Sequence, residues 1–257
     1  MSEFVGLEVS ESVGTIRMDR PPRNTIDVVF ASELHQAALE ASRRDDVRAV
    51  VIWGGERVFS VGGDVELMLN RSEETVRPVI SALGDALVTL GAVPKVVIAA
   101  INGLCLGGGC EIVLAADFRF ASESAVLGQP EIRFGIMPGA GATQRLPRLI
   151  GRSAAKDLIY SGRKVKAREA LALGLVDKLF RSDQVYAAAV EAAANYAKGP
   201  IAAIGAAKAA NDAGIGWSPS DGLDLERDLV CQLFGTQDQK EGMGAFLASR
   251  SPDFKGR

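Results

Sequence analysis

Residues 102–111, with the sequence NGLCLGGGCE, constrain the fold more than any other segment of the chain. An apolar run at 96–101 precedes them and is typical of a buried strand. Residues 112–116 (IVLAA) follow and suit a buried helix. The sequence therefore predicts a glycine turn that joins a strand to a helix. Because a helix N-terminus carries unpaired N–H groups and glycine adds no Cβ, this turn is suited to hold an oxyanion beside Glu111.

Strands and helices are predicted to alternate as far as about residue 180, which favours an α/β core. Apolar–polar alternation over residues 4–18 indicates a β-hairpin, and Asp27 is placed to cap the next helix. From residue 153 onward we expect mostly helix, and we divide the chain into a core (1–197) and a C-terminal helical region (198–257). The other expected elements are strands at 48–53, 95–101 and 117–121 and helices at 73–90, 167–173, 186–197 and 202–213.

Composition narrows the classes of protein. The 257 residues are 47% hydrophobic, enough for a real core, and the net charge of −3 argues against a nucleic-acid partner. No apolar run approaches the ~20 residues of a membrane span, so no membrane partner is expected. The first residues show no leader pattern, and three cysteines without a CxxC pair suit reduced thiols. We therefore expect a cytoplasmic protein.

The single histidine, His35, removes much chemistry from consideration. Zinc sites built on several histidines are excluded, a Ser-His-Asp triad would have to use His35, and no metal site is expected. His35 is instead interpreted as an ordinary helix residue. Cys105 or Cys110 would make a poor nucleophile because neither has a histidine nearby in the sequence, although a helix N-terminus can lower a thiol pKa.

Three glycine-bearing turns, at 58–64, 102–111 and 138–145, accompany two carboxylates. Glu131 follows a proline in the GQPE segment at 128–131, which predicts a loop position for it. Neither GxGxxG nor GxxxxGK[ST] fits these turns, so nucleotide binding is not favoured. Each feature alone is compatible with tight packing, a helix-dipole carboxylate or a solvated charge. Together they suit one reaction class, in which backbone donors stabilise an enolate oxygen and carboxylates move protons.

The motifs NGxxxGGGxE, GQPE and PGAGxTQRL, together with RP…N near residue 20 and DQKEGM…AF near residue 240, resemble the enoyl-CoA hydratase (crotonase) family over nearly the whole chain. The resemblance implies a crotonase-like (ClpP/crotonase) spiral of ββα units with a C-terminal helical trimerisation region. It also implies a homotrimer, or a hexamer made of two trimers, and an acyl-CoA thioester as substrate. No cofactor is implied beyond the coenzyme A carried by that substrate.

The same resemblance implies individual roles. The N–H groups of Gly63 and Gly108 form the oxyanion hole, Glu111 holds and activates water, and Glu131 delivers a proton to C2. Because the two carboxylates share a dry site, the pKa of one of them should rise. The remaining residues implied to bind substrate are Gly62, Asp64, Val65, Glu66 and Phe246.

Two positions depart from the family pattern. The first turn reads VGGD where AGAD is common, so Gly63 adds backbone freedom at an oxyanion donor. Ser249 replaces a lysine that often contacts the coenzyme, and whether Arg250 substitutes for it is left open. The favoured function is enoyl-CoA hydratase. The alternatives are a Δ3,Δ2-enoyl-CoA isomerase or another crotonase-type acyl-CoA lyase, and a non-catalytic acyl-CoA-binding protein.

Overall fold

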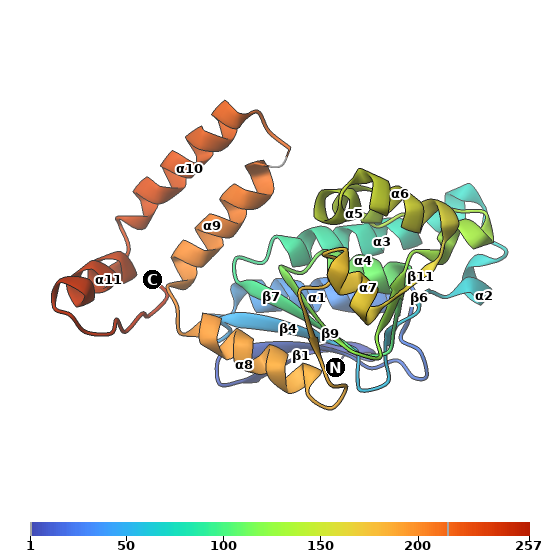
Figure 1. The fold of residues 1–257 in the computed structure, drawn as a ribbon, viewed down its shortest axis with the longest axis horizontal. Helices are drawn as coiled ribbons and strands as arrows, with labels where there is room; N and C mark the ends of the chain where they lie inside the picture. The colour runs from blue at the N-terminus through green and yellow to red at the C-terminus, as the bar shows by residue number, and fades with distance from the viewer. Residues whose placement is uncertain (1, 215) are drawn as a thin grey trace.

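The computed structural model describes residues 2–214 and 216–257. Strands and helices alternate as far as residue 197, and only helices follow in the described part of the chain (Figure 1). Three residues (198–200) separate the last core helix, α8 (Val185–Ala197), from α9 (Ile201–Gly214). This interval begins at the expected boundary between residues 197 and 198, and the division into two domains stays a prediction.

A six-stranded sheet forms the base of the core, with the strand order β1-β2-β4-β7-β9-β12. The β1–β2 pair is the expected antiparallel hairpin, closed by Glu11 and Ser12 with positive φ, and all the other neighbours are parallel. Every residue of β4 and β7 is buried because helices cover both faces of the sheet. The bounds are β1 (Val5–Ser10), β2 (Val13–Met18), β4 (Ala49–Trp53), β7 (Val96–Ile101), β9 (Phe118–Ser122) and β12 (Lys178–Phe180).

Two smaller sheets stand over the large one. One has four strands in the order β11-β10-β8-β5, and the other pairs β3 with β6 in parallel. None of these six strands was expected individually, because two or three residues are too short to show a period of two. The bounds are β3 (Thr25–Ile26), β5 (Val58–Ser60), β6 (Gly62–Gly63), β8 (Leu104–Leu106), β10 (Val126–Gly128) and β11 (Lys164–Lys166).

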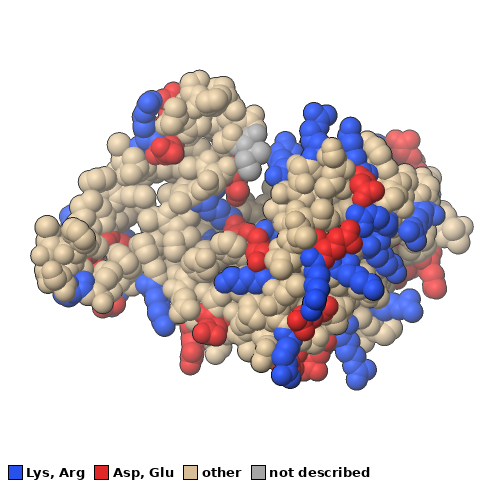
Figure 2. Space-filling view, in the orientation of Figure 1, with Lys and Arg blue, Asp and Glu red and all other residues tan. Residues whose placement is uncertain are grey.

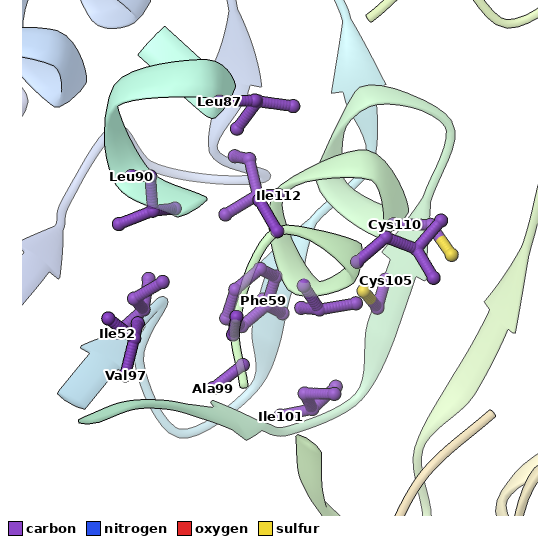
Figure 3. Packing of buried hydrophobic residues seen from close by; sticks show 14 of the residues in the cluster. Ile52, Phe59, Leu87, Leu90, Val97, Ala99, Ile101, Cys105, Cys110 and Ile112 are labelled. Atoms are coloured by element: carbon purple, nitrogen blue, oxygen red, sulfur yellow. The ribbon is translucent and has the colours of Figure 1, made fainter. Parts of the chain in front are cut away.

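Helices α1 (Val28–Arg43), α3 (Glu73–Gly91) and α4 (Gly108–Leu114) cover one face of the large sheet, and α8 covers the other. Asp27 caps α1 as expected, since its side chain accepts from the Phe30 N–H at 2.9 Å. Figure 3 shows Leu87 and Leu90 of α3, Ile112 of α4 and Phe59 of β5 packed over β7. This packing fixes the start of α4 against the short strands.

The expectation of mostly helix after residue 153 is confirmed, and the one difference is two short strands, β11 and β12, that the sequence did not indicate individually. Their neighbours explain the difference: β11 pairs with β10, and β12 extends the large sheet beside β9. Tertiary pairing thus overrides a helix-rich local composition. The later helices of the chain are α5 (Ala142–Ile150), α6 (Arg152–Ser161), α7 (Ala167–Ala172), α10 (Pro219–Leu233) and α11 (Gln237–Leu247), besides α8 and α9.

Helices α9–α11 project from the core as a separate layer (Figure 1). Among the described residues after 200, only Asp238 and Ala245 are buried. A cavity of about 1040 Å³ opens between α9 and the core, and Figure 2 shows the corresponding hollow. Within residues 2–214 and 216–257, no helix combines the length and the apolar character needed to cross a membrane.

Candidate active site

Three short parallel strands end at one edge of the four-stranded sheet and deliver the predicted site segments there. β5 leads to the Gly62–Gly63 strand, β8 leads to Gly107 and α4, and β10 leads to Gln129. The register pairs Ser60 with Cys105 and Leu106 with Gly128, so these strands end side by side. The segments that follow β5, β8 and β10 therefore meet, although they lie far apart in the sequence, because the carboxyl ends of parallel strands lie on the same side of the sheet.

The two candidate oxyanion donors lie on touching segments. A Cβ added to Gly62, whose φ is +88°, would lie 2.9 Å from the Gly108 nitrogen. Gly108 is the first residue of α4, so its N–H has no partner within the helix. The Asp64 N–H donates to the Ile26 carbonyl (3.1 Å). Because successive amides of a strand point to opposite sides, the Gly63 N–H faces away from β3.

Glu111 is buried, with 3% of its surface exposed, and it lies on the first turn of α4. Its Oε1 accepts from the N–H groups of Ala140 (2.8 Å), in the turn before α5, and Ala142 (3.0 Å), the first residue of α5. Burial raises the pKa of Glu111, whereas these two amides and the charge of Arg145 oppose the rise. The two amides therefore fix the orientation of the Glu111 carboxylate. Together with Arg145 they also offset part of the rise in its pKa.

Glu131 lies in a short 3₁₀ helix (Pro130–Phe134) rather than in the irregular loop that was expected. Proline sets the φ of the first helical position, so the same residue that suggested a loop begins a helical turn. Its Oε1 would lie 3.0 Å from a Cβ added to Gly107, which places the carboxyl group directly over the start of α4. Glycine at 107, with φ +54°, leaves room for it.

Electrostatics connect Glu131 to Glu111. Burial, and to a smaller extent the negative charge of Glu111, raise the pKa of Glu131 to about 7. The side-chain amide of Gln129, 1% exposed, donates to both carboxylate oxygens of Glu131 (3.0 and 3.2 Å) in the orientation that satisfies its surroundings. The expected rise in pKa is thus present, and its main cause is burial rather than the like charge.

The segment after Gly63 forms α2 (Val65–Met68), which Asp64 caps by accepting from the Leu67 N–H at 3.2 Å. Val65 and Glu66 are exposed on this helix at the rim of the site. The terminal methyl of Met68 would lie 2.7 Å from a Cβ added to Gly63. Met68 therefore occupies the space that alanine would take in an AGAD turn.

Phe246 is the one predicted site residue that the chain does not bring to the others. It belongs to α11, it is 82% exposed, and Figure 1 shows α11 at the opposite end of the molecule from α2. Arg250 is engaged locally, since its guanidinium forks onto both carboxylate oxygens of Glu241 (2.6 and 2.9 Å). Its charge is therefore matched within the C-terminal region.

Sequence reasoning missed three groups that support the carboxylates. These are the amides of Ala140 and Ala142, the side chain of Gln129, and Arg145, all within the quoted GQPE and PGAGxTQRL motifs. The glycines of the second motif were a signal for exposed N–H groups, but nothing in the sequence identified what they bind. Cys105 is fully buried and burial raises the pKa of its thiol, which does not suit a nucleophile.

The site thus combines adjacent main-chain donors with one buried and one partly buried carboxyl group, an arrangement suited to proton transfer beside a stabilised oxyanion. Comparison with known proteins supports the same class of chemistry. The model of the enoyl-CoA hydratase/isomerase family matches residues 8–257. YngF of Bacillus subtilis is 40% identical over 250 residues, covering 96% of each chain. The crotonyl-CoA hydratase of Syntrophomonas wolfei is 36% identical over 255 residues, covering 98% of each.

Solved structures agree in fold. The crystal structure of an enoyl-CoA hydratase from Bacillus anthracis superposes with a TM-score of 0.94 at 36% identity, covering 99% of this chain and 100% of that one. An enoyl-CoA hydratase from Polaromonas sp. JS666 gives a TM-score of 0.93 at 25% identity, covering 98% and 100%. The expected crotonase-like fold is confirmed. The chain belongs to the enoyl-CoA hydratase/isomerase family.

Proposed function

We propose that this protein is an enoyl-CoA hydratase, which adds water reversibly and syn across the 2,3 double bond of trans-2-enoyl-CoA thioesters. The observation that carries the proposal is the pair of carboxyl groups, buried Glu111 and partly buried Glu131, beside two touching glycine turns. A relative named for hydration of crotonyl-CoA supports the same reaction.

In this proposal the N–H groups of Gly63 and Gly108 bind the thioester carbonyl oxygen and stabilise the negative charge that develops on it. Ionised Glu111 takes a proton from water as the water oxygen bonds to C3. The electrons of the double bond move toward the carbonyl, and protonated Glu131 supplies the proton that bonds to C2. A pKa of about 7 suits Glu131 to this role because half of the molecules keep the proton at neutral pH. Every step uses groups of this chain, and we propose no metal and no additional cofactor.

The test is an assay of crotonyl-CoA hydration by the wild type and by Glu111→Gln. The reaction is measured as the decrease in enoyl-thioester absorbance. We expect the wild type to turn over and the variant to lose ~10²-fold or more, since the group that activates water is gone. An isomerase that relies on Glu131 would keep most of its activity in Glu111→Gln on a 3-enoyl-CoA. A wild type that binds crotonyl-CoA without changing its absorbance would identify a binding protein instead.

We also propose that the C-terminal region (198–257) assembles the chain into a homotrimer, or into a hexamer of two trimers. Phe246 and Leu247 of α11 are 82% and 83% exposed, and Phe234 and Val230 of α10 are exposed as well. Such apolar surface favours burial against a second copy. In this assembly Phe246 would complete the substrate site of a neighbouring subunit.

The free cysteines of the chain are consistent with the expected cytoplasmic location.

A further inference from the structure

We propose that Arg145 is a positioning residue for Glu111: it holds the turn whose amides orient the catalytic carboxylate. This inference rests on the proposed hydratase function, in which Glu111 activates water. Arg145 lies on the first turn of α5, outside the set of residues that the family resemblance assigned to the site.

The guanidinium of Arg145 joins the turn at 139–141 to a second element. Its Nη1 donates to the Ala140 carbonyl (3.1 Å), and its Nη2 donates to the Leu87 carbonyl of α3 (3.2 Å). Leu87 is fully buried in the core, so one half of the fork is attached to a rigid element. The Arg145 backbone N–H also donates to the Gly141 carbonyl (2.8 Å). The planar fork of arginine suits two acceptors at a fixed separation.

Ala140 is the link between Arg145 and Glu111. Its carbonyl accepts from Arg145, and its N–H donates to Glu111 Oε1 at 2.8 Å. Gly141 makes the close approach possible, because a Cβ added at this residue would overlap Arg145 Nη1 and its φ is +125°. A shift of the turn therefore moves both amides that aim the carboxylate. A misplacement of about 1 Å at a reacting group can cost ~10²-fold in rate.

Charge supports the same assignment. The charge of Arg145 lowers the pKa of Glu111 against the rise caused by burial. The ionisable groups that act on Glu111 are Arg145 from α5 and Glu131 from the 3₁₀ helix, and the charge of Asp212 of α9 acts on Arg145 in turn. Without Arg145, Glu111 would therefore hold its proton to higher pH than it does in the wild type.

A purely structural role for Arg145, tying α5 to α3, predicts a different outcome. Loss of the tie would lower the free energy of unfolding and reduce the amount of active protein, but it would leave the pH dependence of the active fraction unchanged. A role through Glu111 changes that pH dependence. It also makes the effect of Arg145 depend on whether Glu111 is present.

The experiment compares Arg145→Met and Arg145→Lys with a matched control, Arg148→Met. Arg148 is exposed one turn further along α5 and donates to Gln144. We expect Arg145→Met to lower kcat for crotonyl-CoA by ~10–100-fold with KM within about threefold, and to move the acidic limb of the pH–rate profile to higher pH. Arg145→Lys should lower kcat and keep the acidic limb, since it retains the charge and loses the fork. Arg148→Met should match the wild type.

A double-mutant cycle keeps the test decisive if Arg145→Met folds poorly. In the Glu111→Gln background, Arg145→Lys should change kcat by less than about twofold, because the group it positions is gone. The proposal would be overturned if Arg145→Lys lowered kcat by the same factor in the Glu111→Gln background as in the wild type. So would an acidic limb in Arg145→Met that coincides with that of the wild type.

A readout without turnover separates this inference from the proposed function. The side-chain carboxyl of Glu111, labelled with carbon-13 and assigned by its absence in Glu111→Gln, should titrate at higher pH in Arg145→Met than in the wild type. If the wild type does not hydrate enoyl-CoA and this shift is present, the hydratase proposal fails and the hold of Arg145 on Glu111 stands. If the wild type hydrates and the titration is unchanged, the Arg145 inference fails.

Discussion

At the scale of single residues, Glu131 illustrates why the environment matters more than residue type. Its carboxyl group is removed from water beside the start of α4, and this raises its pKa to about 7. The sequence predicted a raised pKa from two like charges, whereas the structure attributes most of the rise to burial. The distinction matters because burial acts in the free protein at any charge state of Glu111.

The raised pKa predicts a pH-dependent stability. Glu131 binds its proton more tightly in the folded chain (about 7) than in the unfolded chain (4.5), so its stabilisation is full below pH 4.5 and is lost as the pH rises through 7. From pH 5 to pH 8 the loss should be about 2–3 kcal/mol in the free energy of unfolding. Urea unfolding at both pH values measures it, and Glu131→Gln should lack this component. Equal pH dependence in the two proteins would contradict the burial of Glu131.

The same group predicts an alkaline limit to hydration. Protonated Glu131 is the proton donor in the proposed reaction, so kcat/KM should fall as the pH rises through about 7. The profile of the wild type measures an apparent pKa that belongs to the Glu111–Glu131 pair. A flat profile between pH 6 and 9 would argue against Glu131 as the acid.

At the scale of elements, the packing of α4 on β5 depends on a missing side chain. A Cβ at Gly109 would lie 2.5 Å from the Ser60 carbonyl oxygen, so Gly109→Ala must push the helix from the strand. We expect it to lower the free energy of unfolding by about 1–3 kcal/mol. Gly84 in α3 has nothing within 4 Å of an added Cβ, so Gly84→Ala should stabilise by about 0.5–1 kcal/mol. Denaturant titration of both variants checks the contrast in sign.

The elements that sequence could predict are those long enough to show a period. The β1–β2 hairpin, the buried strands β4 and β7 and helix α3 were all expected within a few residues of their observed bounds. The strands that position the site, β5, β8 and β10, have three residues each and carry no periodic signal. The glycine motifs and both glutamates were found because they are local features. The amides that bind Glu111 were not, because that contact joins residues 29 and 31 positions apart.

At the scale of the whole molecule, the exposed end of α11 predicts assembly. Leu247 is 83% exposed, and we expect Leu247→Glu to shift the sedimentation of the protein from a trimer or hexamer toward the monomer, because a buried carboxylate would oppose association. Leu171→Glu, at a 41% exposed leucine of α7 in the core, is the matched control and should leave the assembly intact. A wild type that sediments as a monomer at micromolar concentration would refute the proposed trimer.

The two tryptophans divide between the core and the C-terminal helices. Trp53 lies in β4 with 5% of its surface exposed and its ring 5.0 Å from that of Tyr186, whereas Trp217 is 52% exposed at the edge of the hollow beside α9. Each part of the chain consequently carries its own natural fluorophore. Replacing either indole by phenylalanine leaves an emission signal that reports on one part alone, so the melting of the core and the docking of the helical layer can be followed separately in the same cuvette.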